Sequence, residues 1–172
     1  MKDLLTGACG EFYVASYLTR KRLIVALPRA GTPGSDLFVA PVGNGRSIRI
    51  QVKTGTDSKR SPKWADKKEI RLWRTSLDII ENQDEYQWFA YVWLKAWPEK
   101  EELPEVFFIP SADVAERMKP ERDELGKNPN HQPFFWGLFD ELKKYQGESG
   151  LQLLLRKLNP EPLTEASDSL YS

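Results

Sequence analysis

The chain has 172 residues, the length of one domain or of one domain with a tail. Hydrophobic residues make up 40% of it and charged residues 29%, a balance typical of globular chains and not of disordered ones. The 25 basic and 25 acidic residues cancel, so total charge alone does not indicate a nucleic-acid binder. No apolar run approaches the roughly 20 residues that span a bilayer, the first residues do not resemble a signal peptide, and the single cysteine, Cys9, excludes an intrachain disulfide. A cytoplasmic location is therefore expected.

The first part of the chain predicts a helix followed by three strands. Apolar residues recur at helical spacing over 3–22, and residues 23–27 form a short apolar strand that Pro28 ends. After a loop at 30–34, two alternating segments at 35–42 and 46–53 flank Gly43-Asn44-Gly45, which predicts a hairpin with a two-residue Asn44-Gly45 turn.

The rest of the chain predicts further strands and then helices. Residues 54–69 are predicted as a polar loop, and 70–82 as a helix or as a strand followed by a helix. Strands are expected at 87–94 and 105–109, a helix from Ser111 with Ser111 as its N-cap, a loop at 120–133, and helices at 134–145 and 151–158. The composition predicts one domain over 1–158 and a disordered tail over 159–172. This order predicts an α/β fold, with a mixed central sheet flanked by helices.

The predicted hairpin brings polar side chains together. A two-residue turn pairs Leu37 with Val52 and Val39 with Ile50, so one face of the hairpin is wholly apolar. The other face then carries Asp36 opposite Lys53, with Gln51 one step away. Side chains that are direct or diagonal neighbours lie about 5 to 8 Å apart, so these three are expected to form one polar patch.

Glu11 is the fourth candidate, because it lies on a largely apolar stripe of the first helix. A carboxylate there is costly to bury unless it is paired or binds a metal. Two carboxylates, an amide oxygen and a lysine suit a hard cation such as Mg²⁺, with the backbone carbonyl of Val52 as a further oxygen ligand. Lys53 would orient or deprotonate a water, or neutralise a transition state.

Three short segments carry a resemblance to a known family. Gly10-Glu11, Gly34-Ser35-Asp36-Leu37 and Ile50-Gln51-Val52-Lys53-Thr54 resemble the PD-(D/E)XK nuclease superfamily, especially its Holliday-junction-resolvase-like and homing-endonuclease-like branches. The resemblance covers residues 7–54. It departs from the family pattern at Ser35, where a proline is common, and at Gln51, which replaces the acidic residue.

The resemblance implies a restriction-endonuclease-like αβββαβ core with extra C-terminal helices. It also implies a hydrolase that cuts phosphodiester bonds of DNA with Mg²⁺ or Mn²⁺, acting as a dimer or tetramer. Glu11, Asp36, Gln51 and Lys53 would be catalytic, and Glu11, Asp36, Gln51 and Val52 would hold the metal.

Basic residues supply candidate nucleic-acid contacts, of the kind that give salt-sensitive affinity for a phosphate backbone. Trp64 lies among them and could stack on an exposed base. The candidates in chain order are Arg29, Arg49, Lys59, Arg60, Lys63 and Trp64.

Each feature also has an ordinary explanation. Asp36 and Lys53 could form a surface ion pair across two strands, and Glu11 and Gln51 could be solvated residues. Two other functions therefore stay open: a degenerate nuclease-fold protein that binds nucleic acid or a protein without cleaving, and a small α/β interaction protein unrelated to nucleic acid.

Overall fold

The computed structural model describes residues 2–29, 34–43, 45–56, 70–95, 102–128 and 130–159. Of the predicted tail over 159–172, the residues from 160 lie outside the described residues, as do residues 57–69 of the predicted polar loop over 54–69. Among the described helices, none is long and apolar enough to cross a membrane.

The described strands form two sheets. The larger sheet has the order β1-β2-β3-β5-β6, and the smaller one pairs β4 with β7. The strands span β1 (Leu23–Ala26), β2 (Leu37–Pro41), β3 (Ile48–Gly55), β4 (Ile70–Arg74), β5 (Gln87–Trp93), β6 (Glu105–Pro110) and β7 (Phe134–Leu138). Neighbours in the larger sheet are antiparallel except β3 and β5, which run parallel, so the sheet is mixed.

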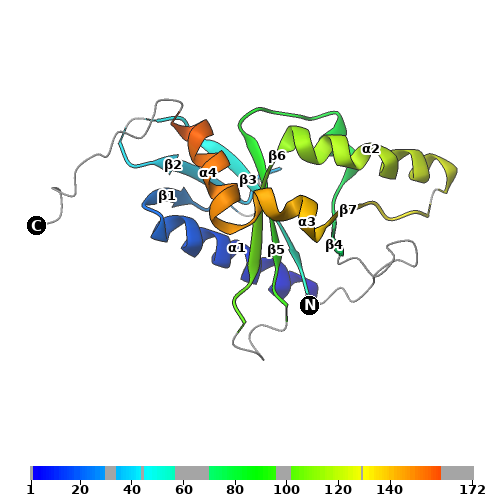
Figure 1. Ribbon diagram of the computed structural model, residues 1–172, viewed down its shortest axis with the longest axis horizontal. Helices are drawn as coiled ribbons and strands as arrows, with labels where there is room; N and C mark the ends of the chain where they lie inside the picture. Colours follow the sequence, from blue (N-terminus) through cyan, green and yellow to red (C-terminus); the bar gives the residue numbers. More distant parts are fainter. Residues whose placement is uncertain are drawn as a thin grey trace, which may run out of the picture.

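The helices cover both faces of this sheet. They span α1 (Lys2–Arg20), α2 (Ser111–Lys127), α3 (Phe139–Leu142) and α4 (Gly147–Leu158), with the 3-10 helices η2 (Leu77–Ile80) and η3 (Lys143–Tyr145). Figure 1 shows α2, β4 and β7 together on one side of the molecule and α1 with β1 on the other. The predicted α/β class, with a mixed sheet flanked by helices, is therefore confirmed.

The core has two layers because β5 is buried on both faces. Trp88, Ala90 and Val92 pack against α1 and α4, while Phe89 and Tyr91 pack against α2, η2 and the smaller sheet. A strand that is buried on both faces has a nearly continuous apolar sequence, and this pattern predicted the strand at residues 87–93.

The predicted hairpin has the right faces but the wrong register. Leu37 pairs with Ile50, and Val39 pairs with Ile48, so the strands are shifted by two residues from the predicted pairs. The connection between β2 and β3 runs from 42 to 47 instead of being a two-residue turn. A shift of two keeps the side-chain alternation, and therefore the buried set of Leu37, Val39, Ile48 and Ile50 is as expected.

The helix from Ser111 is longer than predicted and begins differently. It continues through Pro120 to Lys127, where a loop was expected, and its N-cap is Pro110 instead of Ser111. The Ser111 hydroxyl donates to the carbonyl of Asp84 at 2.6 Å, which attaches the helix to the turn before β5. The second half of the helix is held by Glu121, whose carboxylate accepts hydrogen bonds from the backbone N–H of Phe134 and from Trp136 Nε1.

The segment predicted as a helix over 134–145 begins instead with β7. Residues 134–138 pair antiparallel with β4, and the helical turns α3 and η3 follow. A short aromatic run does not distinguish a strand from a helix by periodicity, and here the partner strand decides. Residues 70–82 take the strand-first alternative: β4 is followed by η2.

Candidate functional site

Asp36 lies directly before the first residue of β2, beside β3. Its backbone N–H donates to the carbonyl of Ile50 at 2.9 Å, and its carboxylate Oδ2 accepts from the backbone N–H of Val52 at 2.7 Å. The two bonds reach the residues on either side of Gln51. Asp36 is therefore held against β3 by backbone groups, and not merely by the pairing of the hairpin.

The carbonyl of Val52 opens toward the same edge. In an antiparallel pair, the N–H and C=O of one residue point to the same neighbouring strand. Val52 N–H points to Asp36, so its C=O points to this edge too, beyond the last pair of β2 with β3, Leu37 with Ile50. That this carbonyl would ligate a metal beside Asp36 stays a prediction.

Glu11, on α1, interacts electrostatically with Asp36. The helix lies directly on the end of β3: a Cβ added at Gly10 would come within 1.9 Å of Thr54 Oγ1, a separation that no side chain can accommodate without a shift. Burial raises the pKa of Glu11, and the negative charge of Asp36 raises it further. The two carboxylates therefore repel each other, which places them in one electrostatic site.

The Lys53 side chain lies on the face of β3 that is opposite to Ile50 and Val52. Its neighbours along that face are Arg49 and Gln51, whereas Ile50 and Val52 face the core. Burial lowers the pKa of Lys53, and Asp36 partly opposes this by favouring the charged ammonium. Asp36 is thus the common member, coupled to Glu11 on one side and to Lys53 on the other.

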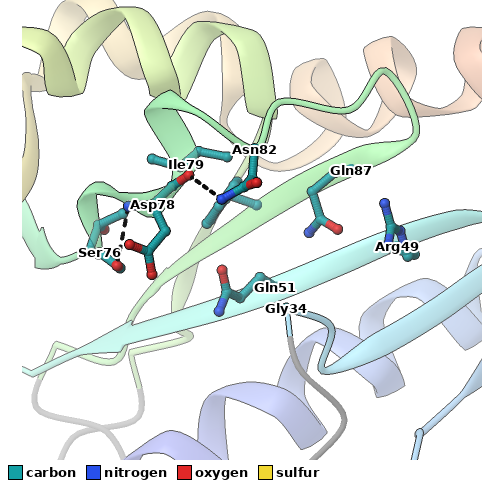
Figure 2. Close-up of a pocket in the computed structure, with 10 residues that line it drawn as sticks. Gly34, Arg49, Gln51, Ser76, Asp78, Ile79, Asn82 and Gln87 are labelled. Atoms are coloured by element: carbon teal, nitrogen blue, oxygen red, sulfur yellow. Dashed lines mark hydrogen bonds between the residues drawn. The ribbon is translucent and has the colours of Figure 1, made fainter.

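Gln51 occupies a neighbouring space. Its side chain lines a cavity of about 420 Å³ together with Gly34, Arg49 and residues of the turn around η2. Figure 2 shows Gln51 on β3 directed toward that turn, with Asp78 opposite it. Sequence reasoning missed this opposite wall, because nothing local indicates that 75–82 would lie over β3.

Only some of the residues predicted to contact nucleic acid lie within the described part of the chain. Arg29 is exposed after β1. Arg49 forms an ion pair with Asp84 at 2.7 Å, with both side chains about two-fifths exposed, so a phosphate would compete with that carboxylate. Lys59, Arg60, Lys63 and Trp64 lie outside the described residues.

The donor set matches a hard cation in kind. Asp36, Glu11 and the Val52 carbonyl offer oxygen atoms, the ligands that Mg²⁺ prefers. Within the described ranges, no group of three or more His, Cys, Asp or Glu side chains is arranged to hold a metal ion. The arrangement therefore has two carboxylates, where an acidic residue at position 51 would make three.

Comparison of the chain with protein-family models, with curated proteins and with solved structures finds no match.

Proposed function

We propose that this chain is a divalent-metal-dependent endonuclease that hydrolyses phosphodiester bonds of DNA on a restriction-endonuclease-like core. The observation that carries the proposal is the anchoring of Asp36 across Gln51, with Glu11 and Lys53 both coupled to it. Two carboxylates and a partly buried lysine around one backbone position form the constellation that the sequence motif implies.

The order of elements supports the same core. A helix, three antiparallel strands, a crossover and a strand parallel to the third agree with αβββαβ except at its second helix. The described part of the crossover holds β4 and η2. The extra helices α2, α3 and α4 follow the core.

The repulsion between the carboxylates of Glu11 and Asp36 is of the kind that a divalent cation relieves. Burial and the charge of Asp36 both raise the pKa of Glu11, and a cation between the two carboxylates would oppose both effects. Glu11, Asp36, the Val52 carbonyl and the amide oxygen of Gln51 would hold Mg²⁺ or Mn²⁺. Bound there, the ion would supply a water of lowered pKa and Lewis acidity toward a phosphoryl oxygen.

Lys53 has two roles in this proposal. As an ammonium, it would stabilise the negative charge that develops on the phosphate oxygens. Its lowered pKa also increases the share of neutral amine at a given pH, which suits an amine that takes a proton from an attacking water. Asp36 opposes this shift by favouring the charged ammonium.

The test uses the full chain and plasmid or branched DNA. With Mg²⁺ or Mn²⁺ the protein should cut, and Asp36→Ala or Lys53→Ala should lower the rate roughly a hundredfold or more. Asp140→Asn, which removes a carboxylate that is 87% exposed, is the matched control and should cut normally. Cutting that survives both site variants contradicts the assignment.

A second candidate function rests on Gln51. An amide oxygen is a weaker ligand for Mg²⁺ than a carboxylate, so a degenerate protein would bind nucleic acid or a protein partner without cleaving. It predicts salt-sensitive DNA binding that EDTA does not change, with no cutting. A Gln51→Glu variant that gains activity from an inactive parent would favour this candidate.

A further inference from the structure

The cavity beside the Asp36 site has walls of defined chemistry. It lies over β3 and β5, under the turn that carries η2, and its volume is about 420 Å³, within the range of small-ligand sites. Seven polar residues, two apolar ones and one glycine line it. These residues are Arg49, Gln51, Thr75, Ser76, Asp78, Asn82, Gln87, Ile79, Phe89 and Gly34.

The walls offer hydrogen-bond acceptors as well as donors. Gln87 Nε2 donates to the carbonyl of Trp88 at 3.1 Å, and Asn82 Nδ2 donates to the carbonyl of Asp78 at 3.0 Å. Each of these bonds uses one N–H of the amide, so each side chain still offers its oxygen as an acceptor and one further N–H to a ligand. Figure 2 shows the carboxylate of Asp78 directed toward Gln51, which adds a third acceptor opposite an amide that can donate.

This chemistry disfavours a phosphate. Arg49 is the cation among the described lining residues, and Asp84 already pairs with it at 2.7 Å. The negative charge of Asp78 would repel an anion. A neutral, flat group that donates N–H bonds at its edge suits these walls better, with Ile79 and Phe89 against its apolar face. Nucleobases with an exocyclic amine have this character, since carboxylates and amide oxygens accept from such amines.

We propose that this cavity binds an unpaired nucleobase with an exocyclic amino group. The inference rests on the proposed function, because it takes the base from a strand that passes Asp36 and Lys53. Gln51 connects the cavity to the Asp36 site. It lines the cavity, and it lies two residues from Lys53, roughly 7 Å along a strand. A base in the cavity would therefore leave a phosphodiester of the same strand beside the two carboxylates and the lysine.

The experiment measures binding in EDTA by fluorescence anisotropy, so cutting does not enter. Three labelled hairpins are compared: one with a single bulged cytosine, one with a bulged thymine, and one fully paired. The bulged cytosine should bind roughly tenfold tighter than the other two, the effect of one good base contact. Asn82→Leu and Asp78→Asn should each remove most of this preference.

Glu81→Gln is the matched control. Glu81 is on the same turn, but its carboxylate pairs with Arg122 of α2 instead of lining the cavity. This variant should keep the full preference for cytosine. Thermal unfolding of all three variants checks that they fold, and Asp78 and Asn82 are exposed enough for substitution to leave the core intact.

Each outcome decides the inference. Equal affinities for the three hairpins, or a cytosine preference that survives both cavity variants, overturns it. Cytidine monophosphate that competes as well as the bulged hairpin would keep the nucleobase chemistry but overturn its assignment to a strand. A cytosine preference in a protein that does not cut DNA would support base binding in the cavity and contradict the proposed endonuclease. Cutting without any base preference would support the endonuclease and contradict base binding in the cavity.

Discussion

The carboxylate of Asp36 accepts a hydrogen bond from the backbone N–H of Val52 at 2.7 Å, although β2 has not yet begun at Asp36. This bond takes the place of strand pairing at the edge of β3. It fixes one oxygen of the carboxylate, while the other is not engaged by any described residue. In the proposed function, a structural role and a chemical role would therefore belong to different oxygens of one side chain.

Asp36 substitutions should separate these roles. Asp36→Asn keeps an oxygen that can accept from Val52 and should unfold within about 1 kcal/mol of the parent, while Asp36→Ala should lose about 1 to 2 kcal/mol of unfolding free energy. Both should lose metal-dependent cutting. Chemical denaturation and a cleavage assay measure the two effects. Equal stability loss in both variants would show that the hydrogen bond is not what anchors Asp36.

Glu11→Gln should stabilise the protein at neutral pH when no metal is present. The folded pKa of Glu11 is raised by burial and by Asp36, so stability falls as the pH rises from the unfolded value of 4.5 through the folded pKa. The variant lacks this loss, and its melting temperature at pH 7 should exceed that of the parent by roughly one or two degrees. Near pH 4 the two should be similar.

Added Mg²⁺ should reverse this order. A ligand that binds only the folded state raises the melting temperature, so the parent should gain more than Glu11→Gln from millimolar Mg²⁺. Glu148→Gln serves as control, because Glu148 pairs with Lys21 on the surface. If Mg²⁺ stabilises the parent and Glu11→Gln equally, Glu11 is not a metal ligand.

Lys53→Met should change how stability depends on alkaline pH. Burial lowers the folded pKa of Lys53 below 10.5, so the parent gains stability as the pH rises from the folded pKa toward the unfolded value. The methionine variant should melt higher than the parent at pH 7, and the difference should shrink toward pH 10. Thermal unfolding across this range measures it. Lys143→Met, at a lysine that is 59% exposed, should show no such convergence.

Gly10→Ala should destabilise the protein while Gly7→Ala should not. A Cβ at Gly10 would meet Thr54 Oγ1 at 1.9 Å and Thr54 Cβ at 2.9 Å, whereas nothing lies within 4 Å of a Cβ at Gly7. We expect Gly10→Ala to cost about 1 to 3 kcal/mol of unfolding free energy and to reduce cutting by displacing Glu11. Gly7→Ala should gain up to about 1 kcal/mol from helix propensity. Equal effects of the two changes would refute the close approach.

The sequence predicted those features that depend on alternation and helical spacing. The helix with Glu11 and the alternating faces of β2 and β3 follow from local patterns, and a two-residue error in register left Gln51 and Lys53 on the expected face. The register itself depended on the length of the connection over 42–47, which the Asn44-Gly45 pair did not reveal. The position of Asp36 depended on a side chain replacing a strand pair, which no periodicity encodes.

Long-range contacts account for the other errors. Residues 134–138 form a strand because β7 pairs with β4. Residues 121–127 stay helical after Pro120, where the hydrogen bond from Phe134 N–H to the Glu121 carboxylate stabilises the helix. The cavity was missed for the same reason, since Gln51 comes from β3 while Asp78 and Asn82 come from the turn after β4.

The smaller sheet also has a consequence for the order of folding. β4 finds its partner only when β7 has been synthesised, with β5, β6 and α2 between them in the chain. Closing so long a loop is slow compared with forming the meander of β1, β2 and β3. During synthesis, the anchored Asp36 would therefore be in place before the turn over Gln51 is tied down, and the backbone amides of β4 should gain protection from hydrogen exchange later than those of β3.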